Sequence, residues 1–319
     1  MKRKHTIVAI IIIGLIAAVI PPCTADPGTY SITQSSKYTL STDGTPLEKL
    51  VPIHHDISSF SDADISQTKI NMNRAGWKLR FHHNSEDTKM EDFKNEIDKS
   101  DIYFHAGHGI NIPNKLMLPL GVKIKIPGPG GHMELKDHPF PNNAVTPDDV
   151  KGKWNHCKWF AIHSCHVLED RDWAGVLKKS NSHGILGFGS IAYTTGHFLA
   201  DFSNLITQDW PMVKAWQKAS IDNMNKYYDD IITVRTFFKN EAQCIRDKLN
   251  KPSPVNDEDI IMCDVEIGHQ KTSWDVFMTS LKTGKTKKWE MGEEDYENNM
   301  NFPIEKASQY YDMNRKTDL

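Results

Sequence analysis

Two short apolar segments, each followed at once by reactive side chains, constrain the fold of this chain most. Residues 101–104 lead into His105-Ala106-Gly107-His108-Gly109, and residues 158–162 lead into His163-Ser164-Cys165-His166. Apolar segments of this length predict buried strands. The strands of one α/β sheet bring their carboxyl ends to a common edge, where ligands usually bind, so we expect His108 and Cys165 to meet there.

The alternation of strand and helix patterns predicts an α/β domain over residues 46–250, with a mostly parallel sheet and helices on both faces. Helical spacing of apolar residues recurs at 62–75, 86–99, 168–179 and 209–228. Further strand patterns occur at 47–53, 77–81 and 184–188. Beyond residue 250 the chain changes to short β segments, at 260–267, 274–281 and 287–291. We therefore expect a small β-rich C-terminal extension over residues 251–319.

A long segment rich in proline and glycine, residues 110–153, separates the two motifs. Loops of this length are uncommon in compact domains unless they serve a function or carry short elements of their own. We expect this segment to form a lid or a substrate-binding loop over the site.

The first 25 residues have the layout of a secretory signal peptide. The basic start Lys2-Arg3-Lys4 precedes an apolar run over residues 6–20, and Cys23 and Ala25 make an acceptable cleavage site. The run is shorter than the roughly 20 residues that span a bilayer. We expect a secreted or cell-surface protein that meets a membrane only through this segment when it is uncleaved, with residues 26–45 as a flexible tether.

The cysteine content suits an exported protein, because the compartment permits disulfides. After cleavage the chain keeps Cys157, Cys165, Cys244 and Cys263. Cys244 and Cys263 lie together in the C-terminal third and are the better candidates for a bridge, although spacing alone does not prove connectivity. Cys165 belongs to the histidine cluster, and we expect Cys157 to be a small buried or free thiol.

A cysteine next to a histidine points to nucleophilic catalysis. A thiolate is a strong nucleophile, but a thiol with a pKa near about 8.5 needs a base or a positive neighbour to ionise near neutrality. His108 is the natural partner of Cys165. The N–H groups of Gly109 and Cys165 are placed to stabilise the oxyanion of a tetrahedral intermediate.

The two motifs resemble those of the caspase-like cysteine peptidases, which include metacaspases and gingipains. Metacaspases carry one strand ending in Tyr-Ser-Gly-His-Gly and another ending in Asp-Ser-Cys-His-Ser-Gly, and the matching runs here are residues 105–109 and 163–167. The resemblance implies that His108 is the catalytic histidine and Cys165 the nucleophile. It covers residues 47–228 and implies a distant prokaryotic branch of the fold.

Departures from the family motif concern the substrate pocket. His163 replaces an aspartate that in metacaspases helps to line a pocket for arginine or lysine, so that specificity does not carry over. We expect His163 and His166 to line the substrate pocket. Gly189, in a glycine-rich turn after the strand at 184–188, is expected to shape one wall.

A metal site is the competing interpretation of the histidine cluster. His105, His108, His163 and Cys165 are side chains of the types that bind zinc tetrahedrally. The two runs match no standard zinc pattern, and no EF-hand spacing supports calcium. A third interpretation is structural, because cysteine is often a small buried residue and a histidine near a core is often only hydrogen-bonded.

Composition narrows the partners. The formal net charge is -3 and the hydrophobic fraction is 39%, so bulk charge predicts no nucleic-acid partner and the chain is able to bury a sizeable core. We expect an exported cysteine hydrolase, with proteolysis of a peptide or protein substrate as the leading reaction. No cofactor is predicted, with zinc or calcium as the alternatives. The alternative function is a non-catalytic secreted binding module of the same fold.

Overall fold

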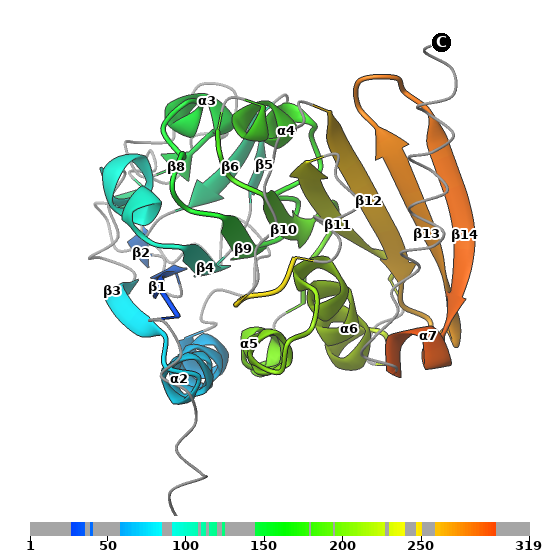
Figure 1. Ribbon diagram of the computed structural model, residues 1–319, viewed down its shortest axis with the longest axis horizontal. Helices are drawn as coiled ribbons and strands as arrows, with labels where there is room; N and C mark the ends of the chain where they lie inside the picture. Colours follow the sequence, from blue (N-terminus) through cyan, green and yellow to red (C-terminus); the bar gives the residue numbers. More distant parts are fainter. Residues whose placement is uncertain are drawn as a thin grey trace, which may run out of the picture.

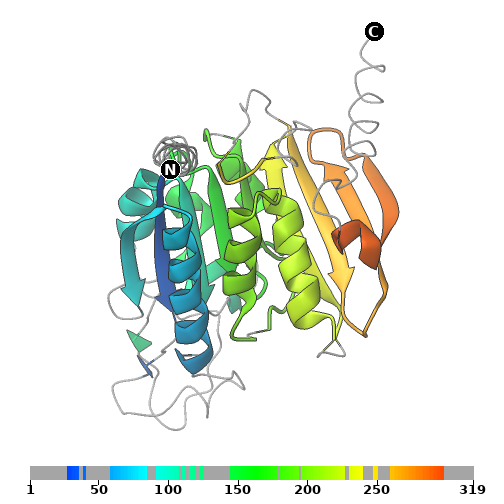
Figure 2. The same ribbon diagram turned by 60° about the horizontal axis from the view of Figure 1, so that its bottom comes forward.

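The computed structural model of the chain describes residues 27–35, 39–40, 58–84, 91–107, 110–112, 115–119, 123–124, 144–178, 180–193, 195–226, 230–239, 247–250 and 259–297. A mixed sheet of nine strands runs through the molecule, with helices on both faces (Figures 1 and 2). The α/β class that the alternating patterns predict is confirmed. The predicted signal peptide and the predicted strand at 47–53 lie outside the described residues.

One half of the sheet is parallel. From the edge inward its strands are β3 (Lys78–Asn84), β1 (Thr29–Ser35), β4 (Ile102–Gly107), β9 (Trp159–His163) and β10 (Gly184–Phe188). Because the strand order reverses between β1 and β4, these two strands flank a topological switch point. The carboxyl ends of all five strands lie at one edge of the sheet, called the carboxyl edge below.

The other half of the sheet is antiparallel, so the prediction of a mostly parallel sheet was too broad. Its strands are β11 (Ile232–Lys239), β12 (Ile260–Ile267), β13 (Ser273–Ser280) and β14 (Thr286–Gly292). Short connections join β12 to β13 and β13 to β14, because antiparallel neighbours need no crossover helix, whereas a longer segment separates β11 from β12. The C-terminal β segments therefore extend the same sheet, and α7 (Glu293–Glu297) follows β14 (Figure 1).

Two helical layers cover the sheet. The helices on one face are α2 (Ser58–Arg74), α5 (Phe198–Thr207) and α6 (Met212–Met224), and those on the other are α3 (Pro147–Val150) and α4 (Asp172–Leu177) (Figure 1). The predicted helix over 86–99 is described from residue 91 as a π-helical turn, η3 (Asp92–Glu96), and a 3-10 turn, η4 (Ile97–Lys99). Phe93 and Ile97, two of its predicted apolar positions, are buried.

The segment between the two motifs contains short elements of its own. β5 (Ile110–Ile112), β6 (Lys115–Pro119) and β8 (Ala144–Val145) form a three-stranded antiparallel sheet. β7 (Lys123–Ile124) pairs with β2 (Thr39–Leu40). The segment therefore folds in part into regular structure, and its role as a lid stays a prediction.

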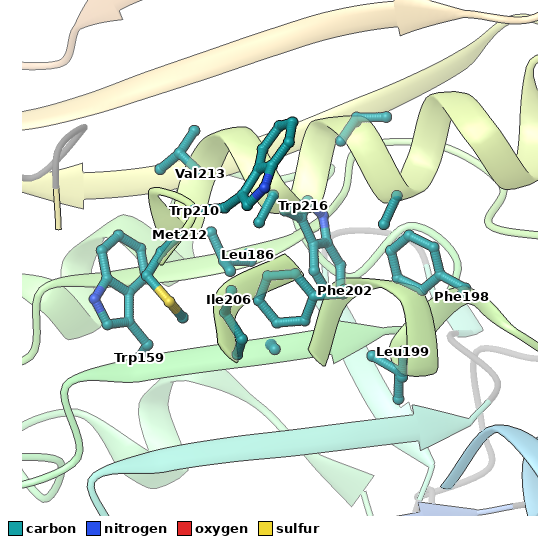
Figure 3. Packing of buried hydrophobic residues seen from close by; sticks show 14 of the residues in the cluster. Trp159, Leu186, Phe198, Leu199, Phe202, Ile206, Trp210, Met212, Val213 and Trp216 are labelled. Atoms are coloured by element: carbon teal, nitrogen blue, oxygen red, sulfur yellow. The ribbon is translucent and has the colours of Figure 1, made fainter. Parts of the chain in front are cut away.

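Aromatic packing fixes α5 and α6 on the sheet (Figure 3). The Trp216 ring meets Phe198 and Phe202 of α5 edge-on, with centroid distances of 4.6 and 5.1 Å. Its indole N–H donates to the Gly187 carbonyl of β10 at 3.2 Å. Perpendicular aromatic pairs add to the free energy gained by burying their surface.

The opposite face has a second aromatic core. Trp154 stacks on Phe160 of β9 at 3.9 Å between centroids and lies 5.8 Å from Trp173 of α4. Its indole N–H donates to the carbonyl oxygen of Phe93 at 2.8 Å. Since both faces of β9 are covered, the strand is a buried central strand, as its apolar composition predicts.

The predicted tether is wrong over residues 29–35, because these residues form β1, which lies between β3 and β4. Tyr30 and Ile32 face one core, while Ser31 and Thr33 face the other, and all four are buried. Thr33 Oγ1 hydrogen-bonds to His105 Nδ1 at 2.8 Å, and the Ser31 hydroxyl is bonded to that of Ser100. The polar side chains of this segment suggested solvent exposure, but their hydroxyl groups are hydrogen-bonded to residues distant in the sequence.

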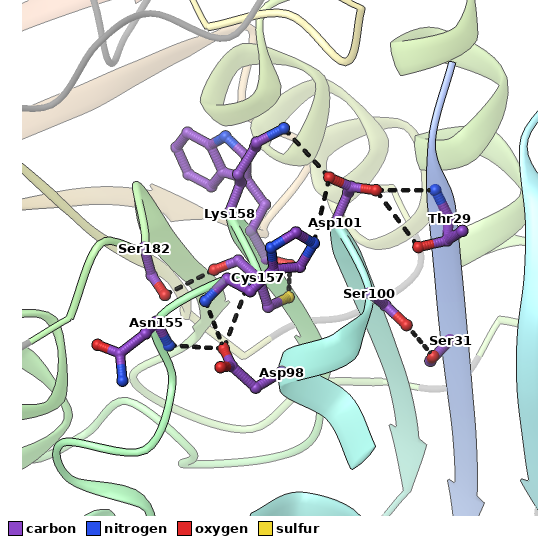
Figure 4. A network of polar contacts seen from close by, with 11 residues as sticks. Thr29, Ser31, Asp98, Ser100, Asp101, Asn155, Cys157, Lys158 and Ser182 are labelled. Atoms are coloured by element: carbon purple, nitrogen blue, oxygen red, sulfur yellow. Dashed lines mark hydrogen bonds and ion pairs between the residues drawn. The ribbon is translucent and has the colours of Figure 1, made fainter. Parts of the chain in front are cut away.

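A network of polar contacts closes the sheet at the opposite, amino-terminal edge (Figure 4). One Asp98 carboxylate oxygen accepts the N–H groups of Asn155, His156 and Cys157 at 2.6 to 3.1 Å. Asp101 accepts the Thr29 N–H at 2.9 Å. The Asp98 bonds tie the segment before β9 to the segment before β4, and the Asp101 bond ties the start of β1 to the same segment.

Cys263, one of the two candidates for a disulfide, has no disulfide partner among the described residues. Cys263 is a free thiol on β12, fully buried, and Gln217 Nε2 donates to its sulfur at 3.5 Å. Burial raises the pKa of this thiol far above its usual range. Cys244 lies outside the described residues, and Cys157 is a buried free thiol, as expected. Within the described ranges no helix has the length and apolar character needed to span a membrane.

Candidate functional site

The two sequence motifs come together at the carboxyl edge. β4 and β9 are neighbouring parallel strands in which Ala106 pairs with His163. The Ser164 hydroxyl, fully buried, donates to the Gly107 carbonyl at 2.8 Å and so ties the two strand ends to each other. His108 and Gly109, the predicted base and oxyanion donor, lie outside the described residues, directly after Gly107.

The Cys165 thiol is half-buried and contacts the segment that follows β10. The backbone N–H of Ala192 donates to Sγ at 3.3 Å, and the Ala192 carbonyl oxygen lies 3.3 Å from the same sulfur. A hydrogen bond donated to sulfur favours the thiolate, whereas one accepted by a carbonyl favours the thiol. Ala192 therefore holds the sulfur in place in either protonation state.

His163 supports the site from inside the core. Its side chain is buried, and its ring centroid lies 4.6 Å from that of Phe198 and 5.8 Å from that of Phe188. Its Nε2–H donates to the Tyr193 carbonyl at 3.2 Å. His163 thus fixes the backbone of the segment that contacts Cys165, whereas the sequence placed it on the pocket wall.

His166 is the more exposed histidine beside the thiol. Its φ of 54° lies in the left-handed region, which costs a non-glycine residue about 1 to 3 kcal/mol. Its N–H donates to the Ser190 carbonyl at 2.7 Å, and its Nδ1 is 2.9 Å from a carboxylate oxygen of Glu169. A ring oriented by a carboxylate, with 31% of the side chain exposed, is suited to bind a polar group or to move protons.

Gly189 lies against a partly buried cation, Arg235. Its N–H donates to the Thr233 carbonyl at 2.9 Å, and a Cβ at this position would lie 3.2 Å from the Arg235 guanidinium. Arg235 binds both oxygens of the Asp264 carboxylate at 2.7 and 2.8 Å and also donates to the Leu168 carbonyl. The space beside Gly189 is therefore occupied by Arg235.

His105 faces away from Cys165. It alternates with Phe104 and Ala106 along β4 and points toward Phe93, on the face covered by α3 and α4. Complete burial, with a smaller effect of the nearby His163 ring, lowers its pKa to about 3. Its Nε2 has no hydrogen-bond partner. His105 is thus a neutral imidazole inside the core.

The four-ligand zinc set is wrong as a set. His163 and Cys165 pack against the core on the α5 side, whereas His105 packs on the α3 side, so a layer of backbone separates them. One ion is unable to bind side chains on both faces of a strand pair. Among the described residues, no group of three or more metal-binding side chains is arranged to hold an ion.

Several residues at the site were not predicted. Ala192 contacts the thiol through its backbone, which gives no side-chain signal in a sequence. The Tyr193 hydroxyl donates to the Asp230 carboxylate, and Glu169 orients His166. The spacing of His166 and Glu169 at i and i+3 is a signal that could have been found.

The fold and the site define an α/β protein with a cysteine at the carboxyl edge of its sheet, directly after β9 and against the segment that follows β10. A family model described as "Domain of unknown function (DUF6345)" matches residues 54–265, more than half of the 319 residues. The chain therefore belongs to the DUF6345 family. The matched range includes both motifs and most of β12, and β1 lies before it. No curated protein matches the sequence.

Proposed function

We propose that this protein is an exported cysteine hydrolase, a peptidase of caspase-like type, in which Cys165 is the nucleophile. The observation that carries the proposal is the position of the Cys165 sulfur: half-buried at the carboxyl edge, 3.3 Å from a backbone N–H donor. The other motif ends on the neighbouring strand, tied to it by the bond from Ser164 to Gly107. Ligands of open α/β sheets usually bind at this edge, so a nucleophile there is suitably placed.

In the proposed reaction His108 takes the thiol proton and Cys165 attacks the acyl carbon of a peptide bond. The N–H groups of Gly109 and Cys165 stabilise the tetrahedral oxyanion. His108 then returns the proton to the leaving amine, which leaves an acyl group on sulfur. Water, deprotonated by the same histidine, hydrolyses the thioester and restores the thiol.

Backbone strain beside the thiol supports a functional role for this turn. The left-handed His166 follows Cys165 directly, and its N–H is bonded to the Ser190 carbonyl. Strained residues of this kind cluster at active sites, where the surrounding structure holds them. The turn keeps the thiol at the carboxyl edge instead of letting β9 continue.

Alkylation by iodoacetamide across pH, resolved by cysteine with mass spectrometry, tests the proposal on the purified mature chain. An activated Cys165 is expected to react with a midpoint at least one pH unit below that of a free thiol, about 8.5. His108→Ala should move the midpoint toward 8.5. His156→Ala, which removes an exposed imidazole from the opposite edge of the sheet, is the matched control. Cys157 and Cys263 are buried and serve as internal references.

Two outcomes separate the enzyme from the alternative binding module. An early midpoint that depends on His108, followed by a covalent acyl adduct on Cys165 with p-nitrophenyl acetate, supports the hydrolase. A midpoint at or above about 8.5 in the wild type contradicts it and favours a non-catalytic secreted protein. Determination of the mature N-terminus from an expression host tests export independently.

A further inference from the structure

We propose that Ile191 and Ile231 form an apolar subsite for the side chain of the substrate residue whose carbonyl is attacked. The inference rests on the proposed function, because it places this subsite beside the Cys165 sulfur. It narrows the substrate class to peptides or acyl compounds with a large aliphatic residue at that position.

Ile191 is close to the reacting sulfur by covalent geometry. The peptide N–H that donates to Sγ belongs to Ala192, and its nitrogen lies 3.3 Å from the sulfur. The Cα of Ile191 is one peptide unit away, which places it within about 6 Å of Sγ. A side chain at this position reaches the space that the acyl group of a substrate occupies.

Ile231 belongs to a second segment that is bonded to the first. The Thr233 N–H donates to the Ser190 hydroxyl at 2.7 Å, and the Tyr193 hydroxyl donates to the Asp230 carboxylate. Ile231 lies between these two attachments. Both segments are at the carboxyl edge, because β10 ends there and the antiparallel β11 begins there.

The two isoleucines are exposed in a protein that buries most of its large apolar side chains. Ile191 is 40% and Ile231 is 53% exposed. In the described part of the chain the other large hydrophobic residues with such exposure are Ile70 and Leu79, on α2 and β3. Their exposure beside a reactive sulfur makes their apolar surface available to a bound ligand.

A carboxylate next to Ile231 is the competing determinant of which substrate side chain is preferred. Asp230 is the acidic residue next to Ile231, and it accepts the hydrogen bond of Tyr193. A substrate with a lysine side chain would be drawn to this carboxylate, whereas an aliphatic side chain would bury the isoleucines. Probes that differ in this one side chain distinguish the two.

The experiment uses N-acetyl chloromethyl ketones of leucine, lysine and glutamine on the full mature chain. The Cys165 thiolate displaces chloride from each probe, so that a C–S bond replaces the C–Cl bond and chloride leaves. Rates are divided by those of a small-molecule thiol to remove intrinsic differences. The leucine probe is expected to react about tenfold or more faster than the glutamine probe. Ile191→Ser and Ile231→Ser should each reduce that ratio several-fold, while Ile70→Ser leaves it unchanged.

Iodoacetamide separates failure of the subsite from failure of the proposed function. If Cys165 of the wild type is alkylated only at the high pH at which a free thiol reacts, the hydrolase proposal fails and the subsite fails with it. If Cys165 is alkylated below the pH of a free thiol in the wild type and in both variants, but the lysine probe is preferred or the leucine-to-glutamine rate ratio does not change, only the subsite is wrong. Alkylation of Cys165 below the pH of a free thiol, together with a leucine-to-glutamine rate ratio that falls in both variants, supports the subsite.

Discussion

Replacement of His105 by glutamine should change how the stability of this protein responds to acid. His105 is fully buried on β4, with Nδ1 bonded to Thr33 and Nε2 without a partner. Burial is the larger cause that lowers its pKa to about 3, and the His163 ring is the smaller. Glutamine keeps hydrogen-bonding groups at the position but does not titrate.

The magnitude follows from the two pKa values. An imidazole whose pKa falls on folding binds its proton more tightly in the unfolded chain, so acid favours unfolding. The stabilisation from neutral His105 is fully present above the unfolded pKa of 6.5 and is lost progressively as the pH falls toward about 3. Only the part of a pH change that lies below the unfolded pKa of 6.5 counts, and there each pH unit lowers the free energy of unfolding by about 1.4 kcal/mol. Lowering the pH from 7.5 to 5 therefore removes about 2 kcal/mol of stability through this residue.

Urea unfolding of the wild type and His105→Gln at pH 7.5 and pH 5 measures the effect. The wild type should lose about 2 kcal/mol more than the variant between the two pH values, on top of a constant difference from the altered bond to Thr33. His156→Gln, at a side chain that is 59% exposed, controls for the loss of an imidazole. Equal losses in the wild type and His105→Gln would show that the core accepts the charged ring and would refute the reasoning.

Two further predictions concern a buried carboxylate and a strained turn. Burial raises the pKa of Asp64 from 3.8 to about 6, although the N–H groups of Leu199 and Ala200 donate to it. The stability of the fold therefore falls as the pH rises from 3.8 through about 6, and Asp64→Asn should gain about 2 kcal/mol on the wild type between pH 4 and 7.5 in urea unfolding. A constant difference would mean that the two N–H donors and the helix dipole fully offset burial, and would contradict the prediction. His269 and Gln270 have φ values of 54° and 53° in the hairpin turn between β12 and β13. An Asn-Gly pair there should stabilise the protein by about 1 to 2 kcal/mol and raise its Tm, and a lower Tm would contradict this.

Strands with apolar interiors were predictable because burial on both faces requires apolar residues throughout. β9 and β10 were found in this way, and the strand patterns at 260–267 and 287–291 correspond to β12 and β14. β1 was missed, because its Ser31 and Thr33 are buried by hydrogen bonds to residues about 70 positions away.

The site was predictable in part, for a related reason. The motif residues Gly107 and Ser164 lie at strand ends, and parallel strands end at a common edge, so their meeting followed from the sequence once the strands were recognised. The face of the sheet toward which each histidine side chain points could not be predicted from the sequence. His105 and His163 face opposite cores because of the register of β4 with β9, in which Ala106 is the partner of His163.

The sequence by itself determined the α/β class, the apolar strands and the cysteine and histidines at their ends, because these depend on local periodicity and composition. Only the tertiary structure decided the antiparallel half of the sheet, the place of β1 and the contacts of Cys165 with Ala192. Those features depend on which distant backbone groups pair and which polar atoms are satisfied on folding. No local pattern encodes such a choice, since it is made by the free energy of the whole packed chain.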